Sequence, residues 1–121
     1  TSLTKAEFAQ MLQSAVTGIQ RMGERSFGRG AGIGDKTLMD ALIPCADTWL
    51  QLAESDESAA SIMKKAAAAA VSGAKETEKM VARMGRAGTV GKRSLGHPDA
   101  GAYALGVIFT ELAEKIQSDD K

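Results

Sequence analysis

Two glycine-rich, basic segments of this sequence have the residue types that bind anions. The first runs from Gly23 to Gly34, with the sequence GERSFGRGAGIG, and leads directly into Asp35, Lys36 and Thr37. The second runs from Met84 to Gly101, with the sequence MGRAGTVGKRSLGHPDAG. Glycine lets a phosphate group approach the backbone closely, and basic side chains supply the opposite charge. The two segments therefore predict an anion site, provided that the fold brings them together.

Composition limits what the chain as a whole can be. Its 121 residues, 44% of them hydrophobic, suit one small domain with a modest core, and we assign residues 1–121 to it. The 15 basic and 15 acidic residues leave no net charge, which argues against general binding to nucleic acid or to a membrane surface. A single cysteine, Cys45, and a single histidine, His97, argue against a disulfide framework and a structural zinc site. Since the sequence also lacks a signal-peptide pattern and an apolar run of the ~20 residues that span a membrane, we expect a cytoplasmic protein.

Apolar residues recur at helical spacing in four segments, and no segment alternates in the manner of a strand. We therefore predict an all-α fold of about four helices. The first helix begins with Thr4 and Glu7 as a capping box and ends at Gly23. The second extends from Asp35 to Ala53 and contains Pro44, which should kink it.

The last two predicted helices differ in the size of their apolar side chains. The third, from Asp56 to Met84, is rich in alanine, so its neighbours can approach closely. We expect Thr77, on its apolar stripe, to bond back to its own helix. The fourth begins with Asp99 as its N-cap. Its predicted apolar stripe comprises Tyr103, Leu105, Ile108, Phe109, Leu112 and Ile116.

The lengths of the connections predict an up-and-down antiparallel array with both glycine-rich loops at one end. Eight basic residues would gather there: Arg21, Arg25, Arg29, Lys36, Arg83, Arg86, Lys92 and Arg93. Three acidic residues would accompany them: Glu24, Asp35 and Asp99. The predicted helix N-termini at Asp35 and Asp99 would add unpaired backbone amides and the positive ends of two helix dipoles. We therefore expect an anionic ligand at this end.

The same residues also have an interpretation without a ligand. In it, Asp35 and Asp99 are ordinary N-caps, the glycines end helices, and the arginines are solvated surface charges. The GRGAGIG run superficially resembles a dinucleotide-binding fingerprint, but no predicted strand precedes it. No residue is predicted to be catalytic. His97 lies beside Pro98 in a loop, where a structural role is more common, and Cys45 has no basic neighbour in the sequence to activate it.

Several motifs, taken in order, resemble the nucleotide-binding L domain of dihydroxyacetone (glycerone) kinases. They are Gly34-Asp35-Lys36-Thr37 followed by Asp40-Ala41-Leu42, then Gly85-Arg86-Ala87, Gly91-Lys92-Arg93-Ser94, Gly96-His97 and Asp99-Ala100-Gly101-Ala102. The resemblance covers nearly the whole chain but only the C-terminal part of that family's domain. In the family, eight antiparallel helices form a closed barrel with the nucleotide at the end where the loops collect. The resemblance thus implies ADP or ATP as the ligand.

Carried over by position, the resemblance implies roles for particular residues. Gly23 and Leu38 would lie near the adenine, and Arg86 would contact the phosphates. Further contacts would come from two loops, with Asp35 and Thr37 in the first and Pro98, Asp99 and Ala100 in the second. In the family, the γ-phosphate passes to dihydroxyacetone held on a separate K domain or subunit. Some bacterial members keep ADP bound and are rephosphorylated by a phosphotransferase-system protein.

The sequence also departs from the family's pattern. The family holds magnesium with a cluster of aspartates in its first interhelical loop, and no such motif occurs between Thr1 and Gly23. Phosphoryl transfer depends on metal and cationic groups that neutralise the phosphate charge, so we expect this chain alone to be inactive. We expect the sequence to be a piece of a longer protein. A natural half that associates with another chain and a divergent module without catalysis are the alternatives.

Four helices taken from a closed barrel would expose an apolar seam. We therefore expect self-association, with the alanine-rich third helix as the seam. The predicted function is the nucleotide-binding part of a dihydroxyacetone kinase, working with a K subunit or domain and, in some members, with a phosphotransferase-system phosphocarrier. The alternative is a non-catalytic helical interaction module that keeps a residual anion pocket.

Overall fold

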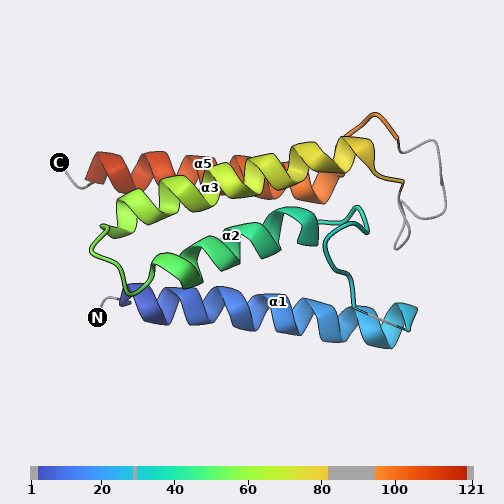
Figure 1. The fold of residues 1–121 in the computed structure, drawn as a ribbon, viewed down its shortest axis with the longest axis horizontal. Coiled ribbons are helices and arrows are strands. Elements are labelled where there is room, and N and C mark those ends of the chain that lie inside the picture. Colours follow the sequence, from blue (N-terminus) through green and yellow to red (C-terminus); the bar gives the residue numbers. More distant parts are fainter. Residues whose placement is uncertain (1–2, 29, 82–94, 120–121) are drawn as a thin grey trace.

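Helices that run alternately up and down make up the computed structural model of this chain (Figure 1). The structure describes residues 3–28, 30–81 and 95–119. In chain order the elements are α1 (Lys5–Phe27), α2 (Met39–Leu52), α3 (Ala59–Glu76), the short 3-10 helix η1 (Thr77–Lys79) and α5 (Ala100–Asp119). The described residues form four α-helices and no strand, which confirms the predicted all-α class.

The topology places the two long connections at the same end of the molecule. α3 packs against both α2 and α5, while α1 packs against α2. Figure 1 shows the end of α1, the start of α2, η1 and the start of α5 at one end, and the α2–α3 turn with the start of α1 and the end of α5 at the other. The predicted up-and-down arrangement is therefore confirmed.

The start of α1 follows the sequence pattern, but its end does not. Thr4 Oγ1 accepts a hydrogen bond from the Glu7 amide at 3.0 Å, and Glu7 Oε1 accepts one from the Thr4 amide at 2.9 Å, which confirms the capping box. The predicted end at Gly23 is wrong, because α1 continues to Phe27 and ends at Gly28, whose φ is +84°. A glycine inside a helix costs only about 1 kcal/mol, whereas the left-handed conformation at Gly28 stops the helix.

α2 begins at Met39, so the predicted start at Asp35 is wrong. The residues before it form a turn in which Lys36 has a φ of +60°. Pro44 lies inside α2, as expected, and has no N–H for the Asp40 carbonyl four residues earlier. Gly73 of α3 comes close to that carbonyl, since a Cβ atom on Gly73 would lie 2.0 Å from the Asp40 oxygen. The proline and the glycine together let α2 and α3 approach closely.

α3 begins after Ser58, whose Oγ accepts a hydrogen bond from the Ser61 amide at 3.1 Å. The prediction that it extends to Met84 is wrong, because the α-helix ends at Glu76 and Met80 is already extended, with φ −105° and ψ 150°. Thr77 Oγ1 donates to the Ala74 carbonyl, so the predicted back-bond is confirmed. The 3-10 helix η1 follows, and it accepts hydrogen bonds from the amides of Gly96 and Asp99.

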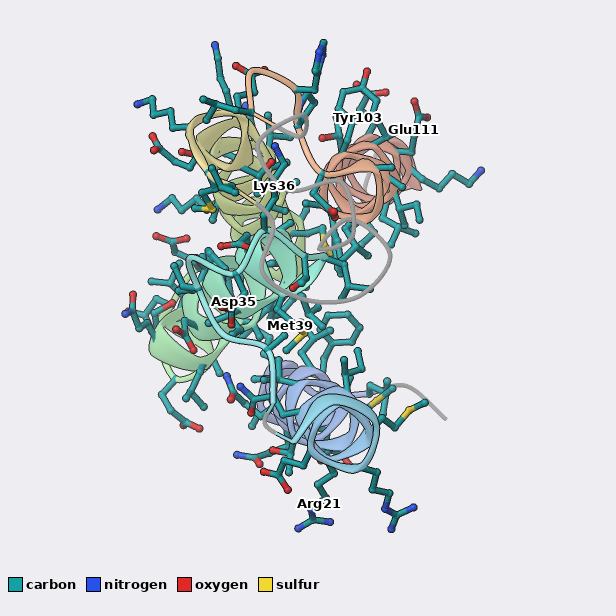
Figure 2. All side chains as sticks on the ribbon, turned by 90° about the vertical axis from the view of Figure 1, so that its right-hand side faces the viewer. Arg21, Asp35, Lys36, Met39, Tyr103 and Glu111 are labelled. Atoms are coloured by element: carbon teal, nitrogen blue, oxygen red, sulfur yellow. The ribbon has the colours of Figure 1, made fainter. Side chains whose placement is uncertain are left out.

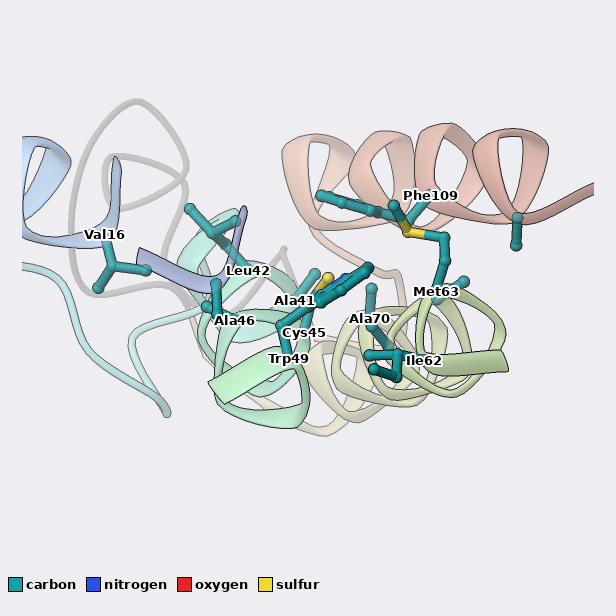
Figure 3. Close-up of a cluster of buried hydrophobic side chains, with 14 of the residues drawn as sticks. Val16, Ala41, Leu42, Cys45, Ala46, Trp49, Ile62, Met63, Ala70 and Phe109 are labelled. Carbon is teal, nitrogen blue, oxygen red and sulfur yellow. The ribbon is translucent and has the colours of Figure 1, made fainter. Parts of the chain in front are cut away.

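The buried core lies between α2, α3 and α5 and is closed from one side by α1 (Figure 3). Trp49, in α2, contacts Phe8 of α1 edge to face, with ring centroids 4.7 Å apart. The predicted apolar seam on α3 is wrong, because its alanines at 66, 67, 70 and 74 are buried between α2 and α5. The large exposed apolar side chains of the helices lie mainly on α1 and α5, among them Met11, Met22, Tyr103, Val107, Ile108 and Leu112.

α5 buries its small residues rather than most of its large ones. Ala102, Phe109 and Ala113 are buried, whereas Tyr103, Ile108 and Leu112 of the predicted stripe are exposed. The cause is the close approach of α3. A Cβ atom on Gly106 would lie 3.2 Å from Val71 Cγ2 and 3.3 Å from Val71 Cα. Only small side chains fit between the two helices there.

None of the described helices has the length and hydrophobicity that a membrane span requires.

Candidate functional site

The turn that precedes α2 is the first component of the candidate site. Both carboxylate oxygens of Asp40 accept hydrogen bonds from the backbone of this turn. Oδ1 accepts from the Gly34 amide at 2.6 Å, and Oδ2 accepts from the Thr37 amide at 2.9 Å. Thr37 Oγ1 in turn accepts from the Met39 amide at 3.1 Å. Gly34 has a φ of +101°, which glycine adopts without strain. Asp40 is 2% exposed, so its carboxylate shapes the turn from inside the protein.

This turn does not provide the free amides that the sequence analysis expected at the start of α2. The amides of Gly34, Thr37 and Met39 are bonded to side chains within the turn. Asp35 is not the N-cap of α2. It is buried, 6% exposed, and its Oδ2 accepts from the Gly32 amide at 2.9 Å. The amides of Gly34, Thr37 and Met39 are therefore not available to an anion.

The segment that leads into α5 is the second component. Asp99 Oδ2 accepts from the Ala102 amide at 2.9 Å, and the Asp99 carbonyl accepts from the Tyr103 amide at 2.9 Å. Asp99 thus caps α5, as predicted. Among the described residues, the amides of Ala100 and Gly101 have no hydrogen-bond partner, so they are the donors that this helix start can offer.

Leu38 and Gly101 bring the two components into contact. A Cβ atom on Gly101 would lie 3.2 Å from Leu38 Cβ and 3.3 Å from Asp99 Oδ2. Leu38 and Pro98 are half-buried, and Ala100 is exposed. Hence the predicted site residues before α2 and those before α5 lie around one end of the molecule.

The remaining predicted site residues are placed differently. Gly23 lies within α1, half-buried, and not at a helix end as the sequence analysis expected. The loop after α1 folds back against that helix, because Gln20 Nε2 of α1 donates a hydrogen bond to the Ala31 carbonyl of the loop at 3.2 Å. Arg86 lies outside the described residues.

The predicted basic cluster is only partly tested by the structure. Arg29, Arg83, Arg86, Lys92 and Arg93 lie outside the described residues. Arg21 is exposed and points away from the other helices (Figure 2). Lys36 is buried and donates hydrogen bonds to the carbonyls of Met80 and His97. Arg25 is also exposed, in the last turn of α1, so Lys36 is the buried member of the cluster within the described residues.

Sequence reasoning missed three features of this end. It treated Lys36 as a surface charge, gave Asp40 no role, and did not pair Thr77 with Asp99, whose amide donates to Thr77 Oγ1 at 2.8 Å. The spacing from Thr37 to Asp40 resembles that of a capping box, and this pattern would have indicated that the Asp40 carboxylate binds the Thr37 amide. The other two features join segments far apart in the chain, and no local pattern signals them.

A cleft of about 430 Å³ lies between α3 and α5 and reaches Pro98. Its walls are mainly apolar, with Val71, Tyr103 and Val107 among them. Figure 2 shows Tyr103 and Glu111 on the outer side of α5, away from α1 and α2. Within the described ranges, no group of three or more His, Cys, Asp or Glu side chains is placed to hold a metal ion.

Comparison with known proteins assigns this arrangement to a family. Residues 1–114 match the model of the DAK2 domain. The chain is 35% identical over 112 residues, 93% of its length, to the PEP-dependent dihydroxyacetone kinase, ADP-binding subunit DhaL, of Escherichia coli (strain K12), and covers 50% of that protein. It is 39% identical over 93 residues, 77% of its length, to an L-erythrulose kinase of Pectobacterium atrosepticum, and covers 16% of it.

More distant matches follow the same pattern. Triokinase/FMN cyclase of Mus musculus is 31% identical over 94 residues, which are 78% of this chain and 16% of the mouse protein. The chain thus spans half the length of the ADP-binding subunit and about a sixth of the larger kinases. The motifs at the loop end, the helical fold and the family match agree, and the chain belongs to the DAK2-domain family.

Proposed function

We propose that this chain is the nucleotide-binding part of a dihydroxyacetone kinase or a related ketose kinase. It binds ADP or ATP at the end where the Gly34–Leu38 turn meets the segment before α5. The observation that carries the proposal is the contact of Leu38 with Gly101 beside the Asp99 cap, in a chain whose relative is named an ADP-binding subunit. The phosphoryl group goes from this site to a ketose on a separate K domain or subunit.

The proposed contacts follow the sequence motifs. Arg86 binds the phosphates, and Pro98, Asp99 and Ala100 line the site next to them at the start of α5, where the helix offers its first free amides. Support comes from the amides of Ala100 and Gly101, which Asp99 does not use. The other proposed contacts are Leu38 and Gly23 near the adenine, and Asp35 and Thr37 in the wall of the pocket.

Magnesium accompanies the nucleotide in the complete domain under this proposal. Its ligands would be acidic side chains outside this sequence, because the sequence has no aspartate cluster like the family's. The chain by itself would then bind nucleotide without catalysing transfer.

Partners follow from the same proposal. A K subunit or domain supplies the ketose, and a phosphotransferase-system phosphocarrier is a candidate phosphoryl donor, all within the cytoplasm. Self-association is supported by the exposed apolar side chains of α1 and α5.

Calorimetric titration with ADP tests the proposal, with and without magnesium and with inorganic phosphate as the control. We expect ADP to bind with an affinity that magnesium does not change, and phosphate to bind much more weakly. Absence of ADP binding would contradict the proposal and favour the helical interaction module.

A further inference from the structure

Lys36 is held in an environment that is unusual for a lysine. It is 2% exposed, although lysine is rarely buried in proteins, and its backbone φ is +60°. Its Nζ donates to the Met80 carbonyl, at 3.3 Å, and to the His97 carbonyl. Burial of this side chain costs rotamer freedom and hydration, which these bonds must offset. The burial of Lys36 is therefore favourable only if its ammonium group keeps these hydrogen bonds.

The ammonium joins segments that are distant in sequence. Lys36 and His97 are separated by 61 positions, and Met80 lies just after η1. Figure 2 shows Lys36 between α3 and α5, at the end that carries the candidate site. We call the bonds of Lys36 to Met80 and His97 the Lys36 clasp.

Two further bonds attach the same segment to η1. The Gly96 amide donates to the Glu78 carbonyl at 2.7 Å, and the Asp99 amide donates to Thr77 Oγ1 at 2.8 Å. Thr77 is fully buried. Residues 96–99 are thus anchored at three points within the described part of the chain, and the Lys36 clasp is the one of the three that connects them to the turn before α2.

We propose that Lys36 is a positioning residue of the nucleotide site, which holds residues 96–99 against the Gly34–Leu38 turn so that both halves of the site form together. This inference rests on the proposed function. Asp40 fixes the turn on one side, and Asp99 starts α5 on the other. Lys36 links the two, and its effect on nucleotide passes through the backbone at His97 and Asp99.

A second lysine provides a matched control. Lys5 Nζ donates to the carbonyls of Ser55, at 2.6 Å, and Glu57, at 2.8 Å. The chemistry is the same, an ammonium group that binds two backbone carbonyls, but these carbonyls belong to the α2–α3 turn at the opposite end (Figure 1). Loss of Lys5 therefore reports the general cost of removing such a group.

The test compares Lys36→Met, Lys36→Gly and Lys5→Met in the full chain. Lys36→Gly is included because glycine adopts a positive φ without strain. This variant should therefore fold even if the methionine variant does not. We measure exchange of the Gly96 and Asp99 amides by NMR and the affinity for ADP by calorimetry. Both Lys36 variants should exchange these amides about tenfold faster and bind ADP at least about tenfold more weakly, the factor expected for a hydrogen bond to a charged group.

Lys5→Met should lower the melting temperature and leave both the exchange of these amides and the ADP affinity unchanged. A folded Lys36 variant with exchange and affinity within about twofold of the original chain would overturn the inference. Equal loss of ADP binding in Lys5→Met would also overturn it, because the effect would then be general destabilisation. If the unaltered chain does not bind ADP, the proposed function fails, while the exchange rates still decide whether the clasp holds residues 96–99.

Discussion

At the scale of single residues, the candidate site depends on side chains that bind backbone. Asp40, Thr37, Thr77 and Asp99 each direct polar atoms at amides near the loop end. These bonds fix the path of the chain and, within the described residues, leave the amides of Ala100 and Gly101 at the start of α5 unbonded. Groups that contact a ligand and groups that shape the site are therefore largely different residues.

Arg86 is the residue with the most specific role in the proposed site. We predict that Arg86→Ala weakens ADP binding by about 1.5–3 kcal/mol, the range for a hydrogen bond to a charged group. The matched control is Arg21→Ala, since Arg21 is exposed and points away from the other helices (Figure 2). Calorimetry should show an unchanged affinity for the control. Equal affinities for both variants would remove Arg86 from the site.

At the scale of elements, glycines decide how closely the helices approach. Gly73 faces the Asp40 carbonyl at a distance that no side chain can occupy, and Gly106 lies against Val71. α3 can therefore lie in the middle of the array with α2 and α5 on either side.

Gly73→Ala should destabilise the fold, because a Cβ atom at position 73 would lie 2.0 Å from the backbone carbonyl oxygen of Asp40. We expect a loss of about 1–3 kcal/mol in the free energy of unfolding, the range for inserting a group into a packed interior. Gly18→Ala is the control. Nothing lies within 4 Å of its added Cβ atom, and alanine should stabilise α1 by up to about 1 kcal/mol. Denaturant unfolding that finds both variants stabilised would contradict this account of the α2–α3 contact.

The sequence could predict the number of helices, their order and the caps at Thr4 and Asp99, because these depend on residues close together in the chain. It could not predict that α3 gives way to η1 after Glu76, where the chain bonds with residues 96–99 from far along the sequence. The exposed face of α5 was mispredicted for a similar reason. Which residues of α5 are buried depends on how closely α3 approaches. The hydrophobicity of the side chains alone does not predict the distance between the two helices.

The candidate site was predictable only in part. The alternating topology predicted that the segments before α2 and α5 meet at one end, and the structure places Leu38 against Gly101 and Asp99 there. The burial of Lys36 was not predictable, since its partners are main-chain carbonyls and carbonyls carry no sequence signature.

At the scale of the whole molecule, apolar side chains remain exposed on α1 and α5. We predict that the chain self-associates, which sedimentation should detect as a concentration-dependent mass. Ile108 is 51% exposed, so Ile108→Lys should shift the chain toward monomer without unfolding it. The control is Glu114→Lys, at another exposed position of α5, which should leave the degree of association unchanged. Monomeric behaviour of the original chain at high concentration would contradict the prediction.

The closed core also controls the chemistry of Cys45. Burial raises the pKa of its thiol from 9.0 to about 12, so the native chain should resist alkylation at pH 8 and react only on unfolding. The unfolded thiol ionises at lower pH than the folded one, so the free energy of unfolding should fall as the pH rises from about 9 toward 12. Cys45→Ala should lack this component of the pH dependence. Rapid labelling of the native chain would show that the thiol is accessible.

The edge-to-face contact of Phe8 and Trp49 has an optical consequence. Trp49 is the single tryptophan of the chain, and it is buried in α2 against a ring that belongs to α1. Separation of α1 from α2 would bring the indole into water and shift its fluorescence emission to longer wavelength, while circular dichroism would still report the other helices. The protein therefore contains an intrinsic spectroscopic reporter for the detachment of its first helix, which can be followed without any added label.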